Sequence, residues 1–183
     1  GITFVDGDVV RSTKAPPQIE DLDTIPFPAW HLMAPATFPM APHQIFARNY
    51  PIAPITTSRG CPFACTYCAS QGLWGRTWRN RSIDNVIDEL TLLARAFGVR
   101  EFHFEDDELL ANEARVLELC DRIASADLGI AWSLPNGVRT NAINDRVAAA
   151  IARAGGYEVG LGIDAPFEHQ QRRVKKPRKP GTT

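Results

Sequence analysis

The sequence contains no apolar run that approaches the roughly 18 residues a helix needs to span a membrane. It also lacks a positively charged start followed by an apolar stretch, which is the pattern of a secretory signal segment. These absences argue against membrane-spanning and secreted proteins, so we expect a cytoplasmic location. With 44% hydrophobic and 22% charged residues, the 183-residue chain has the composition of an ordinary globular protein.

Cysteine is scarce and unevenly placed. Three of the four cysteines fall within CPFACTYC at 61–68, in the spacing C-x₃-C-x₂-C, whereas Cys120 lies far along the chain. Small secreted proteins that depend on disulfides are much richer in cysteine than this chain. In a reducing compartment, such a cluster indicates a metal site or a catalytic site.

Acidic residues are missing from one part of the chain, the closing QQRRVKKPRKPGTT. Six of the 20 basic residues lie there, so the rest of the chain has 14 basic residues against 21 acidic ones. An acidic body disfavours nucleic acid as a partner. We expect the tail to be a solvated or frayed end. Its cations are Arg172, Arg173, Lys175, Lys176, Arg178 and Lys179.

The first third of the chain divides into two segments. Residues 1–13 predict a hairpin that turns at Asp6-Gly7, and because the chain starts at Gly1 we expect this hairpin to be the end of a preceding domain. Residues 14–54 hold nine of the 14 prolines and form a connecting segment that cannot sustain a helix or a central strand. We expect an extended segment pinned to a surface by its apolar side chains. These are Leu22, Ile25, Phe27, Trp30 and Leu32.

From residue 55 onward, strand-like and helix-like patterns alternate. Ser82 and Asn112 are the expected N-caps of the first two helices, and Gly98 is the expected stop of the first. Strands that alternate with helices of 11–15 residues predict an α/β fold with parallel strands, either an open sheet or part of a βα barrel. In either fold, the site lies at the carboxyl ends of the strands. The expected strands are 53–58, 99–105, 129–135 and 157–163, and the expected helices are 83–97, 113–125 and 144–154.

The cysteine loop follows the first of these strands. Three thiolates can bind three irons of a 4Fe–4S cluster and leave the fourth iron open for a substrate or cofactor. A structural zinc site would instead need a fourth ligand, for which Cys120 and His103 are candidates. Cys120 lies on the apolar face of a helix and is expected in the core. His103 alternates with Phe102 and Phe104, and is expected to be a strand residue with a satisfied imidazole.

TSRGCPFACTYCAS resembles the cluster loop of radical S-adenosylmethionine (radical SAM) enzymes, C-x₃-C-x-aromatic-C, with Tyr67 in the aromatic place. Other stretches resemble the subgroup that carries an N-terminal cobalamin-binding domain. The resemblance covers roughly residues 20–164, and extends to the closing GTT. It implies a partial radical SAM barrel of about four βα units over 55–165, followed by a basic tail at 166–183. The stretches are DLDTIPFPAWHL, WRNRSIDNVIDEL, FGVREFHFEDDELL, WSLPNGVRT and AGGYEVGLGID.

The resemblance also implies a mechanism. Cys61, Cys65 and Cys68 would bind the cluster, and the open iron would chelate the amino and carboxylate groups of S-adenosylmethionine. Reductive cleavage of that cofactor would give a 5′-deoxyadenosyl radical, with electrons from a donor such as flavodoxin or ferredoxin. Tyr67 would pack near the adenine. Cobalamin, for methyl transfer or a related modification, would require a domain absent from this chain, and the substrate stays open.

Polar residues at the other strand ends complete the expected site. One acid after the second strand would receive the cofactor's ammonium, although the three acids there also fit a solvated loop. Arg139, after the third strand, could pair with a carboxylate, or belong to a solvent-exposed Asn-Gly turn. Asp164 ends the fourth strand and would contact the ribose, where the family commonly has glutamate followed by serine. The remaining candidates are Glu105, Asp106, Asp107, Ser133 and Asn136.

Two features depart from the family pattern. The cobalamin-binding signature D-x-H-x-x-G does not occur, and four strands are expected where the family's barrel has about six. We therefore expect a fragment or a degraded version of the enzyme, with an unpaired flank on the fourth strand that lowers stability and favours aggregation. The rivals are a methylthiotransferase or an oxidative cyclase, which share the loop, and a zinc or iron–sulfur module without catalysis. Cys120 distinguishes the non-catalytic module from the enzymes, because a fourth cysteine ligand would leave no open position on the metal.

Overall fold

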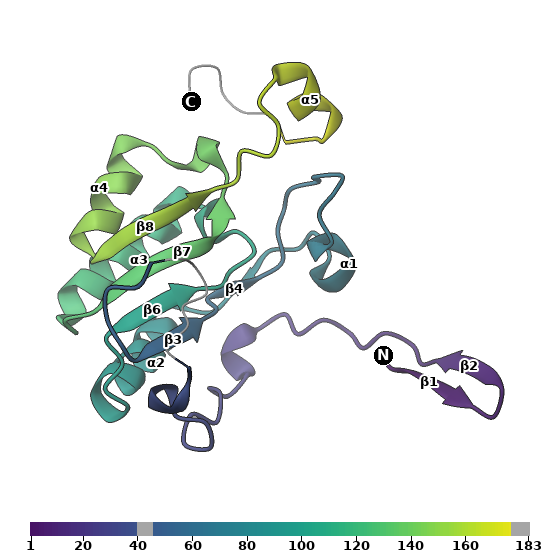
Figure 1. Cartoon of the computed structure of the whole chain (residues 1–183), viewed down its shortest axis with the longest axis horizontal. Coiled ribbons are helices and arrows are strands. Elements are labelled where there is room, and N and C mark those ends of the chain that lie inside the picture. The colour runs from purple at the N-terminus through teal and green to yellow at the C-terminus, as the bar shows by residue number, and fades with distance from the viewer. Residues whose placement is uncertain (40–45, 177–183) are drawn as a thin grey trace.

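The computed structural model describes residues 1–39 and 46–176, and its centre is a parallel sheet (Figure 1). The strand order β3-β6-β7-β8 follows the sequence, and each neighbouring pair is parallel. The predicted α/β fold with a partial parallel barrel is thereby confirmed, and β8 lies at one edge of this four-stranded sheet. The strands are β3 (Ile52–Ile55), β6 (Glu101–Phe104), β7 (Ala131–Val138) and β8 (Gly156–Leu161).

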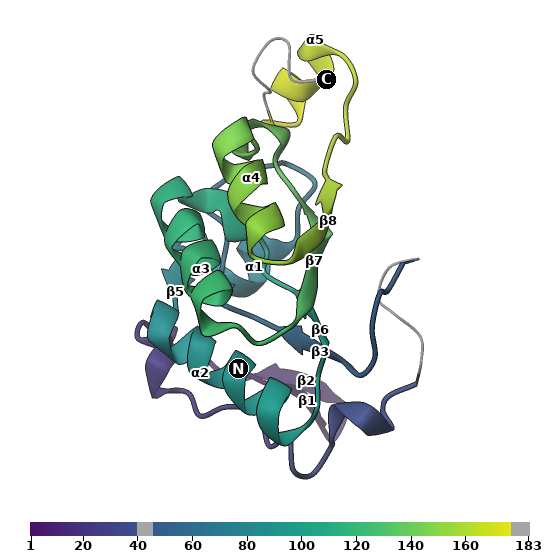
Figure 2. The ribbon, with the colours of Figure 1, turned by 90° about the vertical axis from the view of Figure 1, so that its left-hand side faces the viewer.

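Three helices connect successive strands and cover one face of the sheet (Figure 2). Each begins where a side-chain oxygen accepts a hydrogen bond from a backbone N–H three residues on, and the acceptors are Ser82, Asn112 and Asn144. The first helix ends just before Gly98, whose φ of 67° lies in the region that favours glycine. The helices are α2 (Ile83–Ala96), α3 (Glu113–Ala126) and α4 (Asp145–Arg153).

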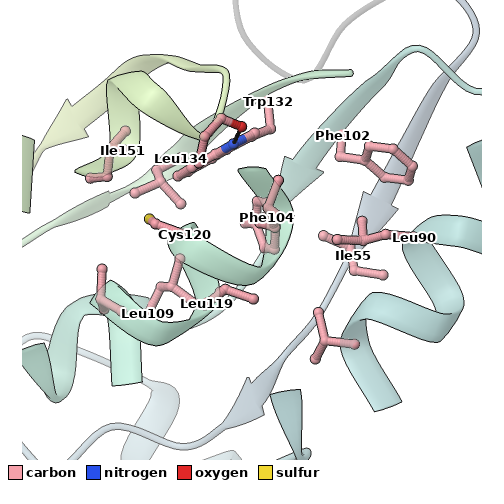
Figure 3. Packing of buried hydrophobic residues seen from close by; sticks show 14 of the residues in the cluster. Ile55, Leu90, Phe102, Phe104, Leu109, Leu119, Cys120, Trp132, Leu134 and Ile151 are labelled. Atoms are coloured by element: carbon pink, nitrogen blue, oxygen red, sulfur yellow. Dashed lines mark hydrogen bonds between the residues drawn. The ribbon is translucent and has the colours of Figure 1, made fainter. Parts of the chain in front are cut away.

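The hydrophobic core lies between this helical layer and the sheet (Figure 3). Phe104 and Trp132, from neighbouring strands, meet edge to face with their ring centroids 5.1 Å apart. Cys120 of α3 is only 2% exposed within this cluster, and burial raises the pKa of its thiol to about 12. Cys120 is therefore a core residue, as predicted.

The proline-rich segment is held on α2 by a buried polar contact. The Trp30 indole N–H donates to Glu89 Oε1 at 3.1 Å, and Arg81 Nη1 contacts Glu89 Oε2 at 2.5 Å. Leu22 is also buried, as expected for an anchoring residue, whereas Leu32 is 79% exposed, so its expected role as an anchor is wrong. The segment is pinned at a few points because proline keeps it extended between them.

Replacing Glu89 with alanine should lower the free energy of unfolding by about 3 kcal/mol, because Arg81 and the Trp30 indole would lose a buried partner. Urea unfolding followed by circular dichroism measures the change. Asp88→Ala, at an exposed position on the same helix, is the matched control and should change stability by less than about 0.5 kcal/mol. Similar losses in the two variants would show that the anchor is unimportant.

The two ends of the described chain differ in part from expectation. The hairpin of β1 (Thr3–Asp6) and β2 (Val9–Ser12) forms, but Asp6 pairs with Val9, so that the turn is Gly7-Asp8. It lies apart from the sheet in Figure 1, with its apolar side chains exposed. The tail was expected to be solvated or frayed. It contains α5 (Glu168–Arg173), and Thr66 N–H donates to the Val174 carbonyl at 3.1 Å, so residues 168–176 are not frayed, whereas Arg172, Arg173 and Lys175 are exposed.

The expected cations Arg178 and Lys179 lie outside the described residues, which end at 176. Over 1–39 and 46–176, no helix has the length and apolar character required to cross a bilayer. The smaller elements are β4 (Ser58–Arg59), β5 (Arg79–Asn80), α1 (Ser70–Trp74) and 3-10 turns at Leu22–Thr24, Pro35–Thr37, Leu109–Ala111 and Thr140–Ala142.

Candidate iron–sulfur and cofactor site

The cysteine loop is closed at its base and organised inside. The strands on either side of it, β4 and β5, pair antiparallel. The two ends of the loop therefore lie next to each other. Within the loop, Cys68 N–H donates to the Cys65 carbonyl at 3.3 Å, and the Gln71 amide of α1 donates to the Phe63 carbonyl at 3.2 Å. The shape of the loop is therefore defined by hydrogen bonds of its own backbone and of Gln71.

Two acids after β6 hold the start of the loop. Asp106 is buried, and its carboxylate accepts hydrogen bonds from the Thr57 backbone and hydroxyl and from the Ser58 hydroxyl. Burial raises the pKa of Asp106, although these hydrogen bonds oppose the shift. Asp107 Oδ2 accepts from Gly60 N–H at 3.1 Å. Both acids therefore tie the end of β6 to the strand that leads into the cysteines.

Gly60, immediately before the first cysteine, cannot be replaced without strain. Its φ is +87°, and a Cβ atom there would lie 2.4 Å from the Thr77 carbonyl oxygen. Glycine lets the incoming and outgoing sides of the loop approach closely. This close approach directs Cys61 toward the carboxyl ends of the neighbouring strands.

A cavity of about 210 Å³ opens where the cysteine loop meets the carboxyl ends of β7 and β8. All three clustered cysteines line it, and they are free thiols that are half-buried or exposed. Burial is the main cause that raises the pKa of Cys61, and the charge of Glu108 adds to it. The other predicted site residues that line this cavity are Tyr67, Asp107, Asn136, Arg139 and Asp164.

Three other predicted site residues lie outside this cavity. Glu105 lines an adjacent cavity of about 220 Å³, which shares Asp107 with the first. Asp106 is buried beneath the loop start, as described above. Ser133 is buried in β7, where it pairs with His103 of β6 and Glu158 of β8. These three predicted residues therefore do not line the cysteine cavity.

Glu108 is a site residue that our sequence reasoning missed. It is 3% exposed and lines the cysteine cavity, and its Oε2 accepts from Arg139 N–H at 3.3 Å. Its other oxygen, Oε1, is buried and has no hydrogen-bond partner within residues 1–39 and 46–176. Burial raises the pKa of Glu108 despite the opposing hydrogen bonds and the charges of Arg139 and Lys176. The run of acids EDDE was the available signal, but we considered only its first three members.

Lys176 is the second missed residue, because it lies in the tail that was expected to be frayed. Its ammonium lines the cavity and pairs with Asp164, which has a left-handed φ of 49°. Burial would raise the pKa of Asp164, but the hydrogen bonds from Lys176 and the Tyr67 hydroxyl outweigh it and lower that pKa. The strand end at Asp164, the cysteine loop and the tail therefore meet in one hydrogen-bonded group.

Arg139 reaches from the end of β7 into the cysteine loop. Its guanidinium carbon lies 4.0 Å from the centroid of the Phe63 ring, and its Nη1 lies 3.8 Å from Cys65 Sγ. We expected this arginine either to pair with a carboxylate or to face solvent. In this structure, its guanidinium lies against a cysteine that is a candidate metal ligand.

The donor set fits a 4Fe–4S cluster better than a single zinc ion. In the part of the chain that the structure describes, no three His, Cys, Asp or Glu side chains converge on one ion position. A 4Fe–4S cluster does not need its ligands to meet at one ion, because each cysteine thiolate binds a different iron at the edge of the cluster. The two proposed fourth zinc ligands lie elsewhere: Cys120 is in the core, and His103 is 2% exposed and bonds Glu101 at 3.2 Å, as a satisfied strand residue should.

Comparison with known proteins identifies related chains. An uncharacterized methyltransferase of Pyrococcus horikoshii is 33% identical over 165 residues, which is 90% of this chain and 34% of the relative. Cytidylyl-2-hydroxyethylphosphonate methyltransferase of Streptomyces wedmorensis is 30% identical over 86% of this chain and 30% of the relative. Anaerobic magnesium-protoporphyrin IX monomethyl ester cyclase of Rubrivivax gelatinosus is 30% identical over 96% of this chain and 31% of the relative. The chain thus spans about a third of the length of these curated relatives.

The fold also matches a solved structure. The radical S-adenosylmethionine methyltransferase TsrM of Kitasatospora setae superposes with a TM-score of 0.63 at 23% identity, over 72% of this chain and 24% of that one. That structure contains cobalamin and a [4Fe-4S] cluster. The model of the Radical SAM superfamily matches residues 55–183, which is well over half of the chain. The fold, the cysteine loop and this match together show that the chain belongs to the radical SAM superfamily.

Proposed function

We propose that this chain binds a 4Fe–4S cluster through Cys61, Cys65 and Cys68 and holds S-adenosylmethionine at the open iron. The observation that carries the proposal is the single cavity, which brings three thiols together with acids and cations from other strand ends. When bound and reduced, the cluster would supply one electron that breaks the C5′–S bond, leaving methionine and a 5′-deoxyadenosyl radical. The residues around the cavity would bind and orient the cofactor.

The polar residues of the cavity match the charges of the amino-acid part of S-adenosylmethionine. Among the acids that line it, Asp107 and Glu108 follow β6. Glu108 Oε1, which has no hydrogen-bond partner among the described residues, is suited to accept a hydrogen bond from the ammonium. Lys176, which also pairs with Asp164, would provide a cation for the carboxylate. Asp106 and Glu105 do not line the cavity. Asp106 would support the start of the loop, and Glu105 lines the adjacent cavity and is assigned no contact with the cofactor.

Asp164, Tyr67 and Asn136 are assigned to the nucleoside part. Asp164 and Tyr67 are hydrogen-bonded to each other at the cavity edge, where a ribose hydroxyl and the adenine ring would approach. Asn136 adds an amide on the exposed side of β7. Ser133 is buried in β7 outside the cavity and would act through the sheet.

For the reaction outcome, we propose cobalamin-dependent methyl transfer or a related modification. Two of the relatives described above are methyltransferases, and TsrM holds cobalamin with its cluster. Cobalamin would be bound by a domain outside this chain, next to the hairpin at 1–13, with 14–54 as the connecting segment. An electron donor such as flavodoxin or ferredoxin would reduce the cluster. Oxidative cyclisation is the second candidate, since a cyclase is 30% identical over nearly the whole chain.

Anaerobic reconstitution with iron and sulfide tests the proposal directly. We expect about four irons per chain, and an electron paramagnetic resonance spectrum of the reduced cluster that changes when S-adenosylmethionine is added. Decay of the cofactor to 5′-deoxyadenosine under a strong reductant would report the cleavage itself. Tight binding of zinc without any response to S-adenosylmethionine would instead support a metal-binding module without catalysis.

A further inference from the structure

Arg139 lies beside one cysteine, with two contacts of its guanidinium and one of its backbone. The guanidinium carbon stacks over the Phe63 ring at 4.0 Å, and Nη1 reaches Cys65 Sγ at 3.8 Å, a distance accessible to an N–H···S hydrogen bond because sulfur is large. The backbone N–H of Arg139 donates to Glu108. The main chain and the side chain of this arginine are therefore both positioned by the walls of the cavity.

We propose that Arg139 is a positioning residue that donates an N–H···S hydrogen bond to the Cys65 thiolate and raises the reduction potential of the cluster. The proposal rests on the proposed function, because it requires Cys65 to bind iron. Reduction adds one negative charge to the cluster and its thiolates. A fixed cation that donates to a thiolate sulfur stabilises the reduced form more than the oxidised form. The chain would then lower the energy needed to deliver an electron to its own cluster.

The stacking partner explains why the residue is arginine. A guanidinium is planar, so it can lie flat on the Phe63 ring while the N–H groups at its edge point to the sulfur. A lysine ammonium carries the same charge but lacks both the flat face and the fork of donors. Phe63 belongs to the same loop as Cys65, so one loop presents both the ring and the sulfur to Arg139.

Acidic and basic side chains both line the cavity, and their charges determine in which direction a substitution shifts the midpoint potential. Glu108, Asp107 and Asp164 line it as acids, whereas Lys176 is its other cation. Lys176 pairs with Asp164, so its charge is offset locally. Arg139 is the cation whose contact with a cysteine sulfur is seen directly, and its removal should therefore dominate any change in potential.

The test is the midpoint potential of the reconstituted cluster, measured by a dye-mediated redox titration followed by electron paramagnetic resonance. We expect Arg139→Gln to shift the midpoint to a more negative potential. Arg139→Lys should shift it less, because the charge is kept and the fork is lost. Phe63→Leu should shift it in the same direction, since the guanidinium loses its platform. A merely structural role for Arg139 would change thermal stability without this graded order.

Arg146→Gln is the matched control, because it removes one arginine charge from an exposed position on α4. It should leave the potential unchanged. A midpoint in Arg139→Gln and Arg139→Lys equal to that of the unmodified chain would overturn the inference and leave the proposed function standing. Failure of the unmodified chain to assemble any 4Fe–4S cluster would overturn both.

Discussion

Replacement of Cys65 by alanine is expected to abolish assembly of the 4Fe–4S cluster while the rest of the protein stays folded. Cys65 is half-buried in a loop and contributes nothing to the hydrophobic core. The loop's own hydrogen bonds at this residue use its backbone carbonyl, which alanine retains, and only the contact from Arg139 uses the sulfur. With only two thiolates left, the cluster loses one of its three anchors. Iron and sulfide content after anaerobic reconstitution measures the loss.

Cys120→Ala is the matched control, and its expected effects are reversed. Cys120 is 2% exposed in the core, so that its truncation should cost about 1–2 kcal/mol of stability and leave the cluster in place. Thermal unfolding of the two variants, without metal, separates the roles. A normal cluster spectrum in Cys65→Ala would refute the ligand assignment. Loss of the cluster in Cys120→Ala would favour a closed site with four cysteine ligands.

The helices and strands of the sheet were predictable because their signals are local. Ser82 and Asn112 mark helix starts by accepting bonds from residues three positions away, and Gly98 marks a helix end by its positive φ, so these signals need no tertiary context. Leu32 shows the limit of this reasoning. Leu32 follows Trp30 in a segment whose apolar residues have no regular period. The sequence of this segment therefore does not tell which of its side chains are buried. The Trp30 indole donates a hydrogen bond to the buried Glu89 carboxylate, whereas Leu32 faces solvent.

The sequence was enough to place the candidate site at the carboxyl ends of the strands. It was not enough to tell which side chains line the cavity. Asp106 and Asp107 are adjacent in sequence and follow the end of β6, yet Asp106 is buried and accepts from Thr57 and Ser58, whereas Asp107 accepts from Gly60 and lines the cavity. Lys176 reaches the cavity only because α5 and the Thr66–Val174 hydrogen bond fold the tail back. Contacts of this kind depend on tertiary structure, which a run of cations does not encode.

Replacement of Glu108 by glutamine is expected to have opposite effects on stability and on cofactor binding. The raised pKa shows that burial outweighs the attractive contacts of the carboxylate, so its charge costs stability at neutral pH. Glutamine keeps an oxygen for Arg139 N–H and removes the charge, which should stabilise the metal-free chain by about 1 kcal/mol. The gain should grow as pH rises above the ordinary value of 4.5 through the raised pKa, and be absent below 4.5. Unfolding in urea at several pH values measures it.

The same substitution should weaken binding of S-adenosylmethionine by about 10–100-fold, because a hydrogen bond from an ammonium to a carboxylate is worth roughly 1.5–3 kcal/mol. Equilibrium dialysis with the reconstituted protein gives the dissociation constant. Glu105→Gln is the matched control, since Glu105 follows the same strand but lines the adjacent cavity, and it should leave the affinity within about twofold. A loss of stability together with unchanged affinity would make Glu108 a structural residue. A gain of stability with a loss of affinity is the behaviour expected of a strained group kept for binding.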